Sequence, residues 1–167
     1  HLFTVGECWC DTLDEVLLHS HSDRDELSTL FQFEHTELGR TEKFSPAPGK
    51  LREVRDVLIK WENRAQEHDL LYSLFTDNHD QPHFISRMAH TPDQRYDMAT
   101  CVATMFYTLK GVPFIYQGQE FGMISPCYDS IDDFDDIESK NFYADFCKTM
   151  TPEEAIAKIN FGSRDNT

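Results

Sequence analysis

The sequence contains no long apolar run and few basic residues. No stretch approaches the roughly 20 apolar residues that cross a bilayer, and the first residues, HLFTVGE, lack the basic start and apolar core of a signal peptide. Lys and Arg total 15 against 30 Asp and Glu, and the resulting formal charge of -15 repels a phosphate backbone. We therefore expect no membrane span, no nucleic-acid partner and a cytoplasmic location.

The cysteines predict neither a disulfide framework nor a metal site. The five cysteines, at positions 8, 10, 101, 127 and 147, lack the even number and spacing of a disulfide framework, so we expect reduced thiols. Cys8 and Cys10 are closer together than the ligand pairs of most structural zinc sites, and no second pair completes a set. Cys101 falls on an expected helix stripe and is interpreted as packing. The acidic run 129–138 does not fit a calcium loop. We expect neither a metal nor a cofactor.

The length limits the architecture. With 167 residues the chain can build one core, but a complete eightfold barrel takes about 250 residues. The hydrophobic fraction of 40%, beside 27% charged residues, is that of a folded globular chain rather than of a disordered segment. We therefore expect one domain or a part of one.

Short apolar runs alternate with helical patterns along the chain. Four runs, at residues 2–5, 30–33, 70–75 and 112–116, are typical of buried parallel strands. Helices are predicted near residues 50–66 and 94–109. Their apolar stripes consist of Leu51, Val54, Leu58, Trp61 and Ala65 in the first helix, and of Met98, Val102, Met105 and Leu109 in the second. This alternation predicts the α/β class, with a parallel sheet inside a layer of helices, closed as a barrel or open.

Acidic and amide residues follow all four predicted strands. Glu7 follows the first, Glu34 and His35 the second, the run 77–80 the third and the run 117–120 the fourth. In a barrel the carboxyl ends of the strands form the catalytic face, where gathered carboxylates suit acid–base chemistry on a glycosidic bond. Taken singly, each residue can equally cap a helix, as Asp and Asn often do. The residues alone thus indicate a barrel-like enzyme with a carboxylate-rich mouth.

Five segments, in their order along the chain, resemble motifs of a single superfamily. Thr4-Val5-Gly6-Glu7 resembles the end of a fifth barrel strand, Phe31-Gln32-Phe33-Glu34-His35 the sixth strand, and Asn78-His79-Asp80-Gln81-Pro82 the motif of the seventh. Residues 111–123, GVPFIYQGQEFGM, are similar to the eighth strand and its loop, and residues 163–167, SRDNT, to the opening of a longer segment. The superfamily is that of alpha-amylase, in its oligo-1,6-glucosidase and alpha-glucosidase branch.

The resemblance implies a fold, an activity and a set of site residues. The implied fold is a partial TIM (β/α)8 barrel, with residues 1–167 as the C-terminal half that carries strands five to eight. The implied activity is that of a retaining alpha-glucosidase on short alpha-linked gluco-oligosaccharides. Glu7 would act as general acid and base, and Asp80 would stabilise the transition state. The residues implied in substrate binding are Asn78, His79, Glu34, His35, Gln119 and Glu120.

The chain departs from the family pattern in two ways. His83 stands where the family usually has Arg after Gln-Pro, so an imidazole replaces a permanent fork-shaped cation, and Arg87 downstream need not substitute for it. The nucleophilic Asp of the family ends the fourth strand, which would precede residue 1. A retaining mechanism needs both an acid and a nucleophile, so we expect the chain alone to be inactive.

Two other functions remain open on the sequence. One is a non-catalytic scaffold of the same fold, because the superfamily includes partners of membrane transporters. The other is trehalose-6-phosphate hydrolysis, although these motifs contain no added basic groups for a phosphate. The expected partners are an oligosaccharide substrate, the missing N-terminal half of the barrel and, through open strand edges at 2–5 and 112–116, a second copy of the chain.

Overall fold

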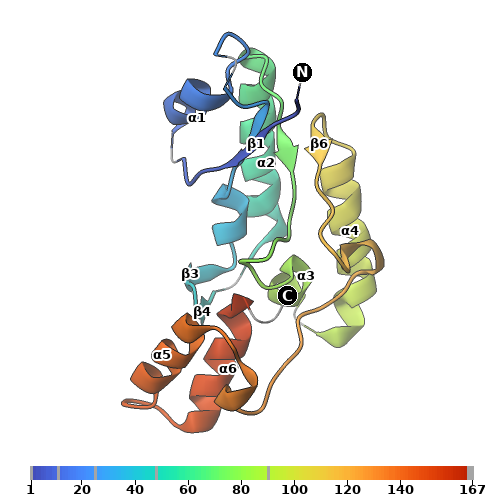
Figure 1. Ribbon diagram of the computed structural model, residues 1–167. Helices are drawn as coiled ribbons and strands as arrows, with labels where there is room; N and C mark the ends of the chain where they lie inside the picture. Colours follow the sequence, from blue (N-terminus) through green and yellow to red (C-terminus); the bar gives the residue numbers. More distant parts are fainter. Residues whose placement is uncertain (1, 11, 25, 48, 90, 165–167) are drawn as a thin grey trace. The chain divides into compact units, whose positions relative to one another are not determined.

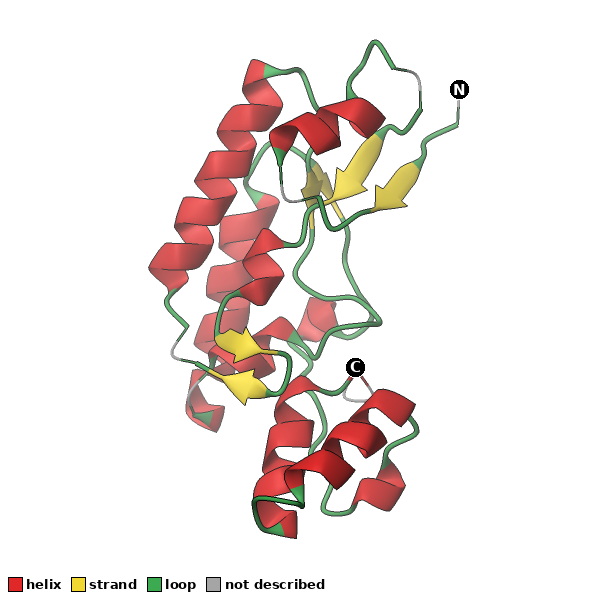
Figure 2. Cartoon of the chain, turned by 90° about the vertical axis from the view of Figure 1, so that its left-hand side faces the viewer, coloured by secondary structure: helices red, strands yellow, loops and turns green. Residues whose placement is uncertain are grey.

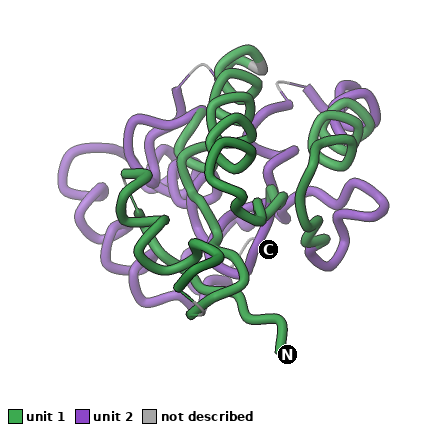
Figure 3. The backbone as a smooth tube through the Cα atoms, turned by 90° about the horizontal axis from the view of Figure 1, so that it is seen from above, with its two compact units in different colours: residues 1–38, 50–76, 100–115 green, residues 39–49, 77–99, 116–167 purple. Residues whose placement is uncertain are grey.

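The chain forms two compact units in a computed structural model that describes residues 2–10, 12–24, 26–47, 49–89 and 91–164. The first unit consists of residues 1–38, 50–76 and 100–115, and the second of residues 39–49, 77–99 and 116–167. Figure 3 colours the two units separately. Each predicted site residue belongs to one unit, so each unit is described by itself.

Four short parallel strands lie in the first unit. β1 (Val5–Glu7) pairs in parallel with β2 (Thr29–Phe31), and β5 (Ser73–Leu74) pairs in parallel with β6 (Val112–Pro113). Thr29 on β2 and Ser73 on β5 are joined through their hydroxyl oxygens, 2.8 Å apart. The strands appear as short arrows in Figure 2. The parallel pairing is confirmed within each pair, and each of the four predicted runs contains part of a strand. β1 shares only Val5 with the run 2–5, and the other three strands are shorter than their apolar runs.

The first unit contains the helices α1 (Leu13–Ser20) and α2 (Leu51–Glu67). α1 begins at a capping signal, and α2 forms where the apolar pattern predicts a helix. The signal is a capping box in which Thr12 and Glu15 bond each other's backbone N–H. α2 buries Val54, Leu58, Trp61 and Ala65, which confirms that predicted stripe, while the side chain of Leu51 lies outside the described residues. Asp69, just beyond the end of α2, has a positive φ of 51°.

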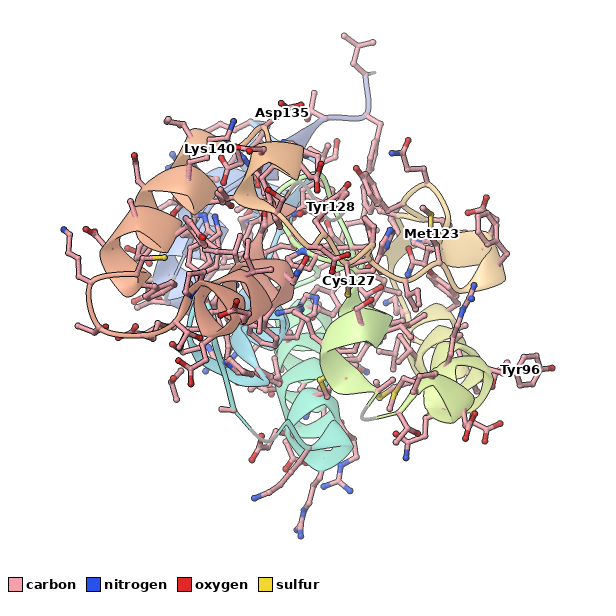
Figure 4. The ribbon with its side chains drawn as sticks, turned by 90° about the horizontal axis from the view of Figure 1, so that it is seen from below. Tyr96, Met123, Cys127, Tyr128, Asp135 and Lys140 are labelled. Atoms are coloured by element: carbon pink, nitrogen blue, oxygen red, sulfur yellow. A yellow bond between two sulfur atoms is a disulfide. The ribbon has the colours of Figure 1, made fainter. Side chains whose placement is uncertain are left out.

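α4 (Arg95–Tyr107) has residues in both units and differs in part from its prediction. Val102 and Phe106 are its buried residues, whereas Met98 and Met105 of the predicted stripe are only half-buried. Cys101 is exposed, so the interpretation of this thiol as core packing is wrong. Tyr96, which is 76% exposed, projects away from the helix in Figure 4.

The second unit contains a hairpin and several helices. β3 (Arg40–Glu42) and β4 (Ser45–Pro46) pair antiparallel. The helical elements are α3 (Phe84–Met88), α5 (Ile137–Phe146), α6 (Pro152–Gly162) and the 3-10 turns η2 (Pro92–Gln94), η3 (Gln119–Phe121) and η4 (Ile131–Asp133). Phe44, Phe134 and Ile159 form the core between the hairpin and the last two helices. Figure 1 shows α5 beside α6.

The cysteines also differ from the prediction. The sulfur atoms of Cys8 and Cys10 are joined in a disulfide, so the expectation that all thiols are reduced is wrong. Cys127 and Cys147 are free and exposed, as is Cys101. Within the described ranges, no three metal-ligating side chains gather into a cluster. No helix found there has the length and apolar character needed to traverse a bilayer.

Candidate active site

Asp80 lies in a tight turn, closed by Asn78 and Gln81, that follows β5 after three intervening residues. Asn78 and Gln81 form an isolated antiparallel bridge across this turn, and the Asn78 side-chain oxygen accepts the backbone N–H of Asp80 at 3.0 Å. Asn and Asp side chains favour such turns because they bond the backbone two residues on. Asn78 therefore shapes the backbone that presents the Asp80 carboxylate, which remains half-buried.

The carboxylate of Asp80 contacts two nitrogen-bearing side chains. Nε2 of His79 lies 3.2 Å from one carboxylate oxygen, and Nη1 of Arg164 lies 3.4 Å from the other. Arg164 also reaches Asp136, with 3.0 Å between Nη2 and Oδ1. The charge of Asp136 and its hydrogen bond, followed by the bond to Asp80, raise the pKa of Arg164 above its usual value. Arg164 thus carries a positive charge beside the Asp80 carboxylate.

Asp136 holds Arg164 from the start of α5. Burial alone would raise the pKa of the Asp136 carboxyl, but hydrogen bonds from the Ser139 side chain and backbone, together with the Arg164 charge, lower it. Asp136 is the N-cap of α5, and its Oδ2 accepts the N–H of Ser139 at 3.0 Å. The sequence analysis quoted the segment of Arg164 as part of a motif but assigned this residue no role. The rest of that motif, residues 165–167, lies outside the described residues.

Glu7 ends β1 in the first unit and is exposed. It lies in register with Phe31 of β2. A Cβ at Gly6, immediately before it, would come within 2.5 Å of Leu27 and 2.7 Å of Leu30, so the ends of these two side chains would have to move to admit one. Glu7 therefore follows a backbone position that is closely packed by two leucine side chains.

The segment after Glu7 borders a hollow in the first unit. The ring of Trp9, 59% exposed, stacks on Phe33 with 4.3 Å between ring centroids. A cavity of about 220 Å³ is lined there by Trp9, Cys10, Gln32, Phe33, Glu34, Glu37 and Lys60. Carboxylate, amide and aromatic groups thus surround one opening near the ends of β1 and β2.

Glu34 and His35, both predicted to bind substrate, make contacts inside the first unit. Oε2 of Glu34 accepts hydrogen bonds from Nζ of Lys60 at 2.6 Å and from Nε1 of Trp61 at 2.8 Å. His35 is 1% exposed, and its Nε2 lies 2.7 Å from the carbonyl oxygen of Phe75. These contacts bind the 3-10 turn η1 (Glu34–Glu37) to α2 and to Phe75, which directly follows β5. Glu34 also lines the cavity, whereas His35 is buried, and the substrate-binding role of both residues stays a prediction.

Gln119 and Glu120 lie in the 3-10 turn η3 of the second unit. Gly118 and Gly122, on either side, both have positive φ values, of 85° and 66°. The side-chain oxygen of Gln119 accepts the backbone N–H of Tyr116 at 3.0 Å, so it closes the turn. Glu120 is exposed. Of the predicted residues, Asn78, His79, Asp80, Gln119 and Glu120 thus lie in the second unit, and Glu7, Glu34 and His35 in the first.

Comparison with known proteins decides the family. The family described as "Alpha amylase, catalytic domain" matches residues 1–166. The chain belongs to the alpha-amylase family. The prediction of the family is therefore confirmed, and so is the TIM-barrel fold of its catalytic domain.

Individual members are similar over nearly the whole chain. The oligo-1,6-glucosidase of Bacillus cereus is 39% identical over 95% of this chain and 28% of that protein. The trehalose-6-phosphate hydrolase of Bacillus subtilis is 33% identical over 98% of this chain and 30% of that protein. A crystal structure of the Bacillus licheniformis trehalose-6-phosphate hydrolase superposes with a TM-score of 0.91 at 31% identity, over 98% of this chain and 30% of that one. The chain thus spans about 30% of the length of these alpha-amylase family members.

Proposed function

We propose that this chain is the C-terminal half of the catalytic barrel of a retaining alpha-glucosidase that acts on short alpha-linked gluco-oligosaccharides. In this proposal β1, β2, β5 and β6 are barrel strands five to eight. The observation that carries it is the placement of two carboxylates, since Glu7 ends β1 and Asp80 lies in the turn that follows β5. The similarity to an oligo-1,6-glucosidase over 95% of the chain supports it.

The chemistry follows from the roles of the two carboxyl groups. Glu7 donates its proton to the glycosidic oxygen as the bond breaks, and later removes a proton from the attacking water. Asp80 is negatively charged beside the ring that develops oxocarbenium character, and it also holds ring hydroxyls. The exposed His79 ring adds a hydrogen-bonding group to the same turn. The nucleophile that forms the covalent glycosyl intermediate comes from a residue outside this chain.

Two substitutions test these roles in an intact enzyme that contains this chain. Glu7→Gln and Asp80→Asn should each lower kcat at least ~1,000-fold, because both carboxyl groups act on charge that develops in the transition state. Turnover of a nitrophenyl alpha-glucoside measures the loss, and the melting temperature serves as the control for folding. A variant that keeps more than ~10% of wild-type turnover with an unchanged melting temperature would show that its residue has another role.

The chain by itself should not hydrolyse the same glucoside. A retaining glycosidase requires two carboxyl groups about 5 Å apart, one as acid and one as nucleophile, and this proposal places only the acid in the chain. Purified chain, freed of host glucosidases, is assayed beside its Glu7→Gln variant. Hydrolysis that the substitution abolishes would refute the assignment of the nucleophile to another segment.

A second candidate is hydrolysis of trehalose 6-phosphate. It is favoured by the TM-score of 0.91 to an enzyme of that name. A phosphorylated substrate would need basic side chains near the glucose site to bind its phosphate, and Arg164 lies 3.4 Å from Asp80.

The two candidates differ in the ratio of kcat/KM for trehalose 6-phosphate to that for isomaltose. A ratio well above one in the intact enzyme would establish the second candidate. If the intact wild-type protein hydrolyses neither substrate, the non-catalytic scaffold would be favoured.

A further inference from the structure

Both ends of the turn that carries Asp80 are tied to one buried carboxylate, that of Asp77. Oδ1 of Asp77 accepts the backbone N–H of Phe84 at 2.6 Å. The same oxygen lies 3.3 Å from Nδ1 of His83. Asp77 directly precedes the turn and residues 83–84 directly follow it, so a single oxygen atom fixes the distance between its two ends.

The pair is well shielded from solvent. The side chains of His83 and Asp77 are 1% and 3% exposed. Since a carboxylate oxygen only accepts, Nδ1 of His83 must carry the proton that faces it. A buried carboxylate is costly without hydrogen bonds, so substitution of the imidazole leaves Asp77 without one of its donors. The contact therefore has little freedom to rearrange.

The backbone of His83 is held from a second direction. Its N–H donates to Oγ of Ser125 at 3.0 Å, and the N–H of Ser125 donates to Oγ of Ser86 at 2.7 Å. The N–H of Ser86 in turn donates to the carbonyl of His83 at 3.0 Å. This closed set of bonds places the ring of His83 against Asp77 and fixes where the turn ends.

We propose that His83 and Asp77 form a positioning pair that sets the direction of the Asp80 carboxylate. The inference rests on the proposed role of Asp80. Between the tied ends, the Asn78–Gln81 bridge and the bond from Asp80 N–H to Asn78 fix the backbone from which the Asp80 side chain projects toward its contacts with His79 and Arg164. A small displacement of a reacting group can lower a rate on the order of 100-fold. His83, which departs from the family motif, thus acts through Asp80 and not through the sugar.

The test compares two substitutions of His83 in the intact enzyme. His83→Leu removes the donor, whereas His83→Asn keeps an N–H close to the position of Nδ1. We expect His83→Leu to lower kcat for a nitrophenyl alpha-glucoside by at least ~10-fold with KM within ~3-fold, and His83→Asn to keep kcat within ~3-fold of wild type. If His83→Leu does not fold, His83→Gln takes its place. The longer glutamine side chain carries its amide past the Nδ1 position, so this variant also lacks the donor that faces Asp77.

A double-mutant cycle with Asp80→Asn separates positioning from a general loss of structure. If His83 acts through Asp80, His83→Leu should change the residual rate of Asp80→Asn by less than ~3-fold. Ile159→Val, a buried substitution in α6, serves as the matched control and should leave kcat unchanged. Equal losses in the Leu and Asn variants, or additive losses in the cycle, would overturn the inference. If Asp80→Asn alone kept its turnover, the proposed function would fail instead.

Discussion

The carboxylate of Glu34 accepts hydrogen bonds from two side chains of α2. Opposing effects on its pKa make the stability of the fold depend on pH. Burial alone would raise the pKa of Glu34, but the hydrogen bonds from Lys60 and Trp61 and the positive charges nearby lower it below its ordinary value of 4.5. Because the pKa is lower in the folded state, this contribution to stability is present above the unfolded pKa. It is lost as the pH falls through the folded value.

Glu34→Gln should therefore destabilise the chain at neutral pH but not in acid. We expect a melting temperature lower by about 2 °C at pH 7, because the pair is partly exposed and worth little more. The difference should shrink as the pH falls below the ordinary value of 4.5. Thermal unfolding followed by circular dichroism measures it. Glu67→Gln, at an exposed position of α2, is the control. A difference in melting temperature that stays constant with pH would contradict the explanation.

Glu34 and His35 also show where prediction from sequence ends at the scale of single residues. The sequence places both directly after an apolar run, whereas β2 ends at Phe31, and two residues separate its end from Glu34. The chain then enters the 3-10 turn η1 at Glu34 itself, so the alternation of a strand no longer decides which way these side chains point. Asp80 differs, because Asn78 can bond the backbone two residues ahead, a signal that is visible in the sequence.

Among the elements, those with a strong apolar pattern were predicted and those without one were not. The stripe of α2 stands out because it buries a continuous surface, and β2 and β5 because most of their residues are buried. β1 and β6 lie in apolar runs of the sequence although their residues are half-buried or exposed. α5 gave no such signal, since Ile137 and Phe142 on it are exposed. The start of α6 was readable, because Thr151 and Glu154 form a capping box beside Pro152. The hairpin of β3 and β4 was not predicted, because its strands are short and their sequences do not alternate between apolar and polar residues.

The end of α2 offers a test of backbone strain. Asp69 adopts a φ of 51°, a conformation that a β-branched residue tolerates poorly and glycine adopts freely. We expect Asp69→Val to unfold more easily than Asp69→Gly by about 1 kcal/mol. Urea denaturation of the two variants, with equal m-values, gives the difference. Equal midpoints would mean that this turn relaxes to another conformation when the side chain changes.

For the whole molecule, the family and the barrel fold could be predicted because several long motifs occur in the right order. The assignment of these four strands as strands five to eight stays a prediction, as do the substrate and the linkage. The chain spans about 30% of the length of its relatives, so these properties cannot be compared along the whole of those proteins. The assignment of the nucleophile to another segment also stays a prediction.

The edges of the strands in the first unit lead to a prediction about assembly. Among the described residues, β1 pairs only with β2 and β6 only with β5, while Leu2, Phe3 and Ile115 near these edges are exposed. Exposed apolar edges favour pairing with a second copy. The charge of -15 opposes it, but salt screens charges beyond about 8 Å. We expect a dimer or a larger assembly by light scattering after size exclusion, or a chain that is only marginally folded when alone. A sharp monomer of 19.5 kDa with cooperative unfolding would refute this.

The bond between Cys8 and Cys10 makes the segment after Glu7 sensitive to its surroundings. Such a bond persists in oxidising compartments and opens where glutathione and thioredoxin keep thiols reduced. With one residue between them, the two sulfurs stay close after reduction and can rejoin when conditions change. Protein trapped with an alkylating agent would take up three labels with the bond closed and five with it open. The label count therefore reports the redox conditions at the moment of trapping.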